Sequence, residues 1–140
     1  MFKGKKVLVL GLAKSGKAAV ELLKFMHADI TINESKKKED IPEYDTYVSE
    51  GIEMVCGGQP DELFERDFDF VVKNPGINYH APFILRLKER GIPVYTEIEL
   101  GYKVAKKQHY IAVTGTNGKT TTVTLIYEIL KAAGRKAHIC

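Results

Sequence analysis

Apolar residues up to position 95 fall in short blocks that are separated by longer mixed segments. The blocks are rich in Val, Ile and Phe, a composition typical of strands. Several are apolar at successive positions, as in parallel strands that are covered on both faces. This pattern predicts buried strands at residues 6–10, 30–32, 52–55, 68–72 and 93–95.

Helical patterns fill intervals between the predicted strands. Apolar residues recur at helical spacing from residue 18 to residue 26, soon after the first strand. Another helix is predicted over residues 82–89, with Gly91 as its C-cap. Strand, helix and strand within about thirty residues make a βαβ unit. Residues 1–96 are therefore predicted to form a doubly wound, Rossmann-like α/β domain with a parallel sheet.

Two helix starts are suggested by capping residues. Thr96 precedes Glu99 by three positions, which is a capping box and predicts a helix over residues 97–107. Asp61 is placed to cap a short helix. The polar stretch 36–50 contains Pro42, so no long helix is expected there.

A glycine- and threonine-rich segment lies between a strand pattern and a helix pattern near the end of the chain. Residues 110–113 are apolar strand formers, and a helical face extends from Val123 to Leu130. The segment between them contains Gly115, Thr116, Asn117, Gly118, Lys119, Thr120 and Thr121. A glycine turn that leads into a helix presents backbone N–H groups to an anion at the positive end of the helix dipole. This predicts a phosphate-binding loop.

The side chains of this loop indicate a nucleoside triphosphate. The Lys119 ammonium can reach terminal phosphates, and the Thr120 hydroxyl is placed to ligate Mg2+. The usual spacing requires a glycine where Val113 stands, so Gly115 makes this a compressed version. A connection that binds nothing is the alternative, but the order of strand, glycine loop with lysine, and amphipathic helix favours the phosphate site.

A domain boundary is predicted between residues 96 and 97. Residues 97–140 would begin a second α/β domain of the P-loop ATPase type, with one strand, one helix and the start of another strand at 136–140. So few elements cannot cover both faces of a parallel sheet. We therefore expect the chain to be part of a longer protein.

A second glycine loop follows the first predicted strand. Gly11 and Gly16 match the ends of the dinucleotide-binding pattern, and Glu34 lies at the distance expected of the acid that binds a ribose. Ala13 replaces the middle glycine, which normally lets the backbone approach a pyrophosphate. A nicotinamide cofactor, another diphosphate-bearing ligand and a purely structural turn are the three alternatives, and the second is favoured.

The loops that follow parallel strands meet at one edge of the sheet. Residues 11–16, 33–36 and 74–78 are such loops, so a ligand crevice is predicted between them. Asn74 and Gly76 supply an amide side chain and exposed backbone N–H groups, which suit a polar ligand and equally suit a tight turn.

Composition and charge exclude several classes of protein. With 44% apolar and 28% charged residues, the sequence is that of a globular protein rather than a disordered one. The net charge of +3 has no basic stripe, so no nucleic acid is expected as a partner. Two distant cysteines indicate neither a zinc site nor a disulfide framework, and no apolar run could span a membrane. A cytoplasmic monomer is expected.

Four segments resemble the Mur ligases. Residues 115–121 are similar to the ATP loop of this family, which has the same compressed form; folylpolyglutamate and cyanophycin synthetases have versions of it. Residues 11–16, 74–77 and 97–100 are similar to the branch that adds D-glutamate. The resemblance covers the whole chain and implies ATP-dependent addition of D-glutamate to UDP-N-acetylmuramoyl-L-alanine through an acyl phosphate, in peptidoglycan precursor synthesis, with ATP and Mg2+.

The resemblance also implies roles for individual residues. Lys119 would act catalytically on the ATP phosphates, and Thr120 would ligate Mg2+ with support from Thr121. The residues implied to bind the uridine diphosphate substrate are Lys14, Ser15, Glu34, Ser35, Lys36, Asn74 and Gly76. Two departures from the family pattern are Ala13 in place of a glycine and residues 34–36 in place of an Asp-Thr-Arg type triplet.

The family's remaining catalytic groups, and the domain that receives D-glutamate, would lie beyond residue 140. Residues 1–140 are therefore expected to bind substrate without turnover. The competing hypotheses are an NAD-binding module, which leaves Lys119 unused, a phosphotransferase or GTPase-like switch with an unrelated first domain, and another amide ligase of the Mur or folylpolyglutamate type.

Overall fold

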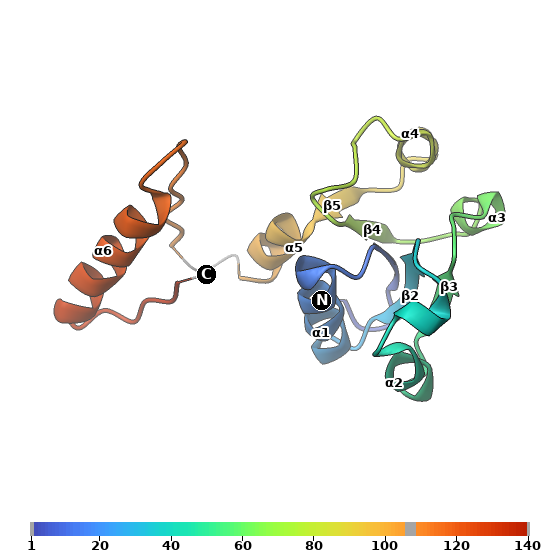
Figure 1. The fold of residues 1–140 in the computed structure, drawn as a ribbon, viewed down its shortest axis with the longest axis horizontal. Coiled ribbons are helices and arrows are strands. Elements are labelled where there is room, and N and C mark those ends of the chain that lie inside the picture. The colour runs from blue at the N-terminus through green and yellow to red at the C-terminus, as the bar shows by residue number, and fades with distance from the viewer. Residues whose placement is uncertain (1, 106–108, 140) are drawn as a thin grey trace. The chain divides into compact units, whose positions relative to one another are not determined.

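The computed structural model describes residues 2–105 and 109–139. It contains two compact units, Met1–Lys106 and Lys107–Cys140, which are described separately (Figure 1). None of the helices in these described ranges is both long enough and apolar enough to cross a lipid bilayer.

The first unit is built on a five-stranded parallel sheet. Strand β1 lies at its centre, and the order across the sheet is β3-β2-β1-β4-β5. The chain therefore moves outward on one side of β1 and then returns to build the other side, as in doubly wound folds. The strands are β1 (Lys6–Leu10), β2 (Asp29–Glu34), β3 (Glu53–Cys56), β4 (Phe70–Lys73) and β5 (Val94–Thr96).

Helices cover both faces of this sheet. Val7 and Val9 face one core, together with residues of α1, α2 and α5. Leu8 and Leu10 face the opposite core, with residues of α3 and α4. The helices are α1 (Lys14–Phe25), α2 (Tyr44–Ser49), α3 (Asp61–Phe64), α4 (Pro82–Glu89) and α5 (Glu97–Val104), and a 3-10 turn, η1, spans Lys38–Asp40. The prediction of a Rossmann-like α/β fold with a parallel sheet is confirmed.

Several local predictions are confirmed by backbone geometry. The hydroxyl of Thr96 accepts a hydrogen bond from the Glu99 N–H, and the Glu99 carboxylate accepts one from the Thr96 N–H, which completes the capping box of α5. Gly91 follows α4 with φ of +73°, and its N–H donates to the carbonyl of Lys88. The C-cap itself is Arg90, so the predicted glycine ends the helix from the position after the cap.

One local prediction is wrong. Asp61 does not cap α3, because the N-cap is Pro60 and the Asp61 carboxylate instead accepts a hydrogen bond from Arg86. The polar stretch 36–50 forms no long helix, as predicted, but it contains the short helix α2, which has Tyr47 as its buried residue. One buried position in six residues produces no helical periodicity, so the pattern could not reveal this helix.

The second unit contains the helix α6 (Lys119–Ala132). The strands predicted at 110–113 and 136–140 are not formed over the described residues, since 109–115 and 135–139 have no regular secondary structure. A strand needs a neighbour to bond its backbone, and in the described part of this unit no paired strand is present. Ile111, Val113 and Ile139 still lie against α6, where they line a hollow with Val123 and Ile126.

Helix α5 packs against α1, β4 and β5 and therefore belongs to the first unit by its contacts. It ends at Val104, and the last two positions of the predicted helix, 106 and 107, lie outside the described residues. The predicted domain boundary at residue 96 thus falls at the start of this helix, earlier than the division between the compact units. The assignment of the two units to functional domains stays a prediction.

Candidate nucleotide-binding sites

The glycine loop after β1 is held in one conformation by close packing against itself. Gly11 has φ of +87°, a region that favours glycine. At Gly16, a Cβ atom would lie 2.0 Å from the carbonyl oxygen of Gly11, so no larger residue fits there. Ala13 is exposed and has an ordinary φ of −65°. The missing middle glycine therefore introduces no backbone strain.

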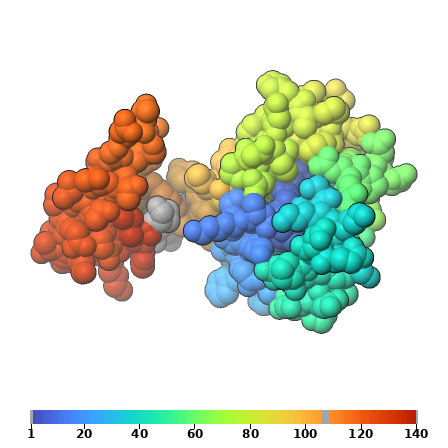
Figure 2. Space-filling view, viewed as in Figure 1, coloured from blue at the N-terminus to red at the C-terminus, as the bar shows by residue number. Residues whose placement is uncertain are grey.

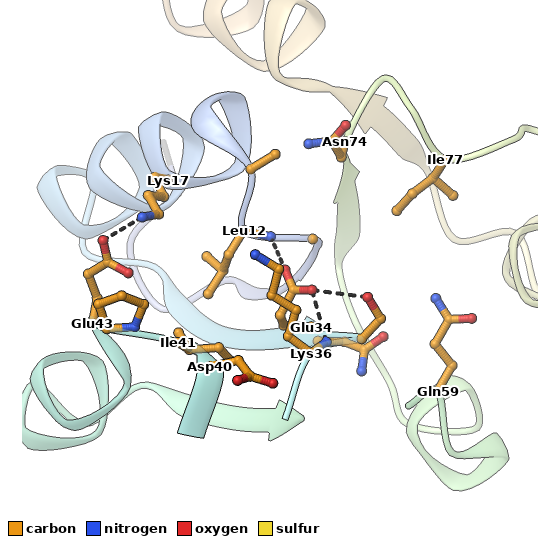
Figure 3. Close-up of a pocket in the computed structure, with 15 residues that line it drawn as sticks. Leu12, Lys17, Glu34, Lys36, Asp40, Ile41, Glu43, Gln59, Asn74 and Ile77 are labelled. Carbon is orange, nitrogen blue, oxygen red and sulfur yellow. Dashed lines mark hydrogen bonds and ion pairs between the residues drawn. The ribbon is translucent and has the colours of Figure 1, made fainter. Parts of the chain in front are cut away.

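The Glu34 carboxylate anchors this loop to the end of β2. It is 7% exposed, and its Oε2 accepts a hydrogen bond of 2.6 Å from the Leu12 N–H (Figure 3). Its Oε1 accepts from the Lys36 N–H at 3.2 Å and from the Ser35 hydroxyl at 3.1 Å. Burial opposes ionisation, but these donors outweigh it and lower the pKa of Glu34 below its usual value.

A cavity of about 310 Å3 opens at the carboxyl edge of the sheet, where the loops after β1, β2 and β4 meet. Figure 2 shows these segments (blue, cyan and yellow-green) gathered on one face of the first unit. The cavity lies at the point where the chain reverses direction across the sheet, the usual ligand position in such folds. It is lined by Gly11, Leu12, Ala13, Lys17, Asn33, Glu34, Ser35, Lys36, Asp40, Ile41, Pro42, Glu43, Gln59, Asn74 and Ile77.

The structure brings some of the predicted substrate residues to this cavity and not others. Glu34, Ser35, Lys36 and Asn74 line it. Three others do not belong to its lining, namely Lys14, Ser15 and Gly76. Ser15 and Gly76 contact Asn74 instead: the Asn74 amide donates to the Ser15 hydroxyl at 3.3 Å, and its Oδ1 accepts from the Gly76 N–H at 2.9 Å.

Sequence reasoning missed several lining residues. Lys17 lies one turn along α1 from the expected Lys14, so its position could have been inferred from helical spacing. Asp40, Ile41 and Glu43 come from the polar stretch between β2 and β3, which has no motif. Gln59 follows β3 in the same way. Only the fold brings these three segments together.

The cavity lining carries charges of both signs. Lys17 and Glu43 form an ion pair at its edge, and this pairing raises the pKa of Lys17 and lowers that of Glu43. Lys36 is exposed at the end of β2. Asn33 is buried and donates to the carbonyls of Val55 and Gly58, which fixes the segment before Gln59. Cations beside amide and carboxylate groups suit a ligand that has both phosphates and hydrogen-bonding rings.

The acid expected to bind a ribose is bonded to the chain itself in this structure. In the dinucleotide-binding pattern, the acid after the second strand accepts hydrogen bonds from ribose hydroxyls. Here both carboxylate oxygens of Glu34 already accept bonds from the chain itself. The Leu12 N–H, which belongs to the glycine loop, is also engaged by this carboxylate.

The loop before α6 has the geometry of an anion cradle. Gly118 is the N-cap of α6 with φ of +78°, and no side chain caps this helix end. The first helical bond runs from the Thr122 N–H to the Gly118 carbonyl, so the N–H groups of residues 119–121 have no helical partner. A left-handed residue followed by helical ones directs successive N–H groups toward one point.

The Lys119 side chain folds back over this loop. Its ammonium donates to the carbonyl of Gly115 and approaches that of Thr116 at 3.5 Å. Lys119 and Thr120 also line a hollow of about 480 Å3 with Val113, Val123 and Ile139. Among the described residues, no group of three or more His, Cys, Asp or Glu side chains could hold a metal ion.

Sequence comparison identifies known relatives of both units. A family described as "Mur ligase MurD-like, N-terminal domain" matches residues 5–96, and "Mur ligase middle domain" matches residues 113–139. The chain is 48% identical over 135 residues to UDP-N-acetylmuramoylalanine–D-glutamate ligase of Streptococcus agalactiae, and 50% identical over 134 residues to that of Streptococcus pneumoniae. Each match covers 96% of the chain, which spans 30% of the length of these relatives.

Solved structures agree with this relationship. A pseudomurein peptide ligase type C from Methanothermus fervidus is 28% identical, with a TM-score of 0.60 over 94% of this chain and 27% of that protein. The UDP-N-acetylmuramate-alanine ligase MurC from Thermotoga maritima is 24% identical, with a TM-score of 0.58 over 93% of this chain and 30% of that protein; it shares the fold. The chain therefore belongs to the Mur ligase family, and its N-terminal domain is of the MurD-like type.

Proposed function

We propose that the chain supplies the substrate-binding domain and the phosphate loop of an ATP-dependent ligase. The ligase adds D-glutamate to UDP-N-acetylmuramoyl-L-alanine, as the names of the relatives that are 48–50% identical indicate for those proteins. The cavity at the carboxyl edge of the sheet is the main support for this proposal, because its lining combines cations with amide and carboxylate groups, which suit a nucleoside diphosphate.

In the first unit, the uridine diphosphate moiety would lie against the loops after β1, β2 and β4. Lys36 and Lys17 would neutralise the diphosphate, and Lys14 at the start of α1 would contribute from outside the cavity lining. Ser35 and Asn74 would bond the polar groups of the nucleotide. Glu34 would act chiefly by holding the Leu12 N–H and the 34–36 turn in place, since its oxygens are already engaged.

In the second unit, residues 115–121 would hold the triphosphate of ATP. The free N–H groups at the start of α6 and the Lys119 ammonium would bind the phosphate oxygens. The Thr120 hydroxyl would help to hold Mg2+, with Thr121 in support, and the ion would offset the negative charge of the phosphates.

The proposed reaction proceeds in two steps. A carboxylate oxygen of the L-alanyl end attacks the γ-phosphorus of ATP, so that an acyl phosphate forms and ADP leaves. The amine of D-glutamate then attacks the acyl carbon, loses a proton and expels inorganic phosphate, which leaves an amide. Lys119 would stabilise the charge on the phosphoryl group during transfer.

Isothermal titration of the 140-residue chain tests the substrate assignment. UDP-N-acetylmuramoyl-L-alanine is expected to bind and NAD is not. Lys36→Met should weaken the binding because the residue lines the cavity, whereas its exposed neighbour Lys37 lies outside the lining and Lys37→Met is the matched control. Binding of NAD in place of the uridine nucleotide would contradict the proposal.

A further inference from the structure

Lys73, the last residue of β4, is buried although it is a lysine. Its side chain is 1% exposed, and lysine is almost never buried so completely without partners. Lys73 does not belong to the lining of the nucleotide-sugar cavity. The roles proposed above do not account for it.

The partners of the Lys73 ammonium are backbone carbonyls of the loop that follows β4. Nζ donates to the carbonyl of Ile77 at 2.8 Å and to that of Asn74 at 3.3 Å. It also lies 4.0 Å from the centre of the Tyr79 ring. No ion pair of this ammonium is found among the described residues; the two carbonyls and the ring contact it, and the more distant carboxylates of Glu97 and Glu99 also favour its charge.

These bonds close the turn formed by residues 74–77. The Asn74 carbonyl accepts from both the Lys73 ammonium and the Ile77 N–H, the latter at 3.0 Å. The Asn74 N–H donates to the carbonyl of Leu10 at 3.0 Å, which ties the turn to the end of β1. Both ends of the turn are thereby fixed to the strands that flank the cavity.

The 74–77 turn, which follows β4, also forms part of the cavity wall. Asn74 and Ile77 line the wall opposite the end of β2, as Figure 3 shows. A cation that fixes the carbonyls of these two residues therefore fixes the wall that they form.

We infer that Lys73 is a positioning residue for the nucleotide-sugar cavity, which it shapes by bonding the carbonyls of Asn74 and Ile77 without touching the ligand. This inference rests on the proposed function, because it assumes that the ligand occupies this cavity. The burial of Lys73 and its two carbonyl bonds are observations that do not depend on the identity of the ligand.

Lys73→Met tests the inference, because methionine keeps the apolar stem and removes the donors. Lys88→Met is the matched control: the Lys88 ammonium lies 4.8 Å from the same Tyr79 ring, but the residue is exposed. Two quantities are measured at pH 7 in buffer without denaturant, namely the dissociation constant for UDP-N-acetylmuramoyl-L-alanine and the hydrogen-exchange rate of the Ile77 N–H. Lys73→Met should raise both about tenfold, the size expected for lost bonds to a charged donor, and Lys88→Met should leave both within about twofold of wild type.

A purely structural role predicts a different outcome. The free energy of unfolding would fall, but the folded chain would bind the ligand with unchanged affinity and the Ile77 N–H would stay protected; this result would overturn the inference.

If Lys73→Met does not fold, Tyr79→Leu is the deciding variant, because it removes the ring beneath the ammonium at a partly exposed position. We expect it to weaken binding about threefold, and unchanged affinity would again overturn the inference. If the wild-type chain fails to bind the ligand, the proposed function is wrong, and the Ile77 exchange rate still decides whether Lys73 fixes the turn.

Discussion

Glu34 shows how one side chain can occupy a position typical of ligand contact and yet act on the backbone. Its spacing from the glycine loop predicts an acid at the ligand, and the structure places it in the cavity lining. Its hydrogen bonds, however, go to the Leu12 N–H, the Lys36 N–H and the Ser35 hydroxyl. Spacing can locate such a residue, but it cannot reveal whether the carboxylate faces the ligand or the chain.

The lowered pKa of Glu34 makes its contribution to stability depend on pH. A carboxyl group whose folded pKa lies below its unfolded value of 4.5 stabilises the fold above that value and loses this contribution as the pH falls through the folded pKa. Glu34→Gln is expected to lower the free energy of unfolding at pH 7 by about 1–3 kcal/mol. Urea denaturation at pH 7 and pH 3 measures this. The difference in free energy of unfolding between the wild type and Glu34→Gln should be smaller at pH 3. An equal difference at both pH values would refute the role of the ionised carboxylate.

Among the elements, α1 and the glycine loop before it depend on each other. Helix α1 begins at Lys14, and its third residue, Gly16, packs against the carbonyl of Gly11. This contact is too close to leave room for a Cβ atom at Gly16. Gly101, in the middle of α5, has nothing within 4 Å of the position of a Cβ atom. The two helical glycines therefore differ in what a methyl group would meet.

Opposite effects on stability are expected from the same substitution at these two glycines. Gly16→Ala should lower the free energy of unfolding by about 1–3 kcal/mol or more, because the loop must move. Gly101→Ala should raise it by about 0.5–1 kcal/mol, because alanine is the better helix former. Thermal and urea unfolding of both variants measure the changes. A similar effect of the two substitutions would mean that the loop is not packed as described.

Much of the molecule follows from its sequence, and the exceptions have physical causes. The continuous apolar run of β1 predicts a buried parallel strand, and Thr96 with Glu99 predicts the start of α5; both are confirmed. The strand pattern at 110–113 does not produce a strand, because strand formation needs a partner that the described part of the second unit lacks.

The candidate site is less completely predictable. Loops that follow strands can be placed at one edge of the sheet from topology alone, which predicts Asn74 near the crevice, whereas Lys36 as a ligand contact is implied by the resemblance to the Mur ligases. Lys17 and Gln59 enter the cavity through the packing of α1 and of the segment after β3. Lys73 has no sequence signal at all, since a lysine at the end of a strand is ordinarily exposed.

For the molecule as a whole, the central claim is that two separate nucleotide sites lie on the two units of this chain. Backbone amide shifts in NMR spectra of the 140-residue chain test it most directly. UDP-N-acetylmuramoyl-L-alanine should shift the backbone amide signals of residues 11–13 and 33–36 and of Asn74, Gly76 and Ile77, whereas ATP with Mg2+ should shift those of residues 115–121. The claim would be contradicted if the uridine nucleotide left the signals of these segments of the first unit unshifted. It would also be contradicted if NAD shifted the same signals.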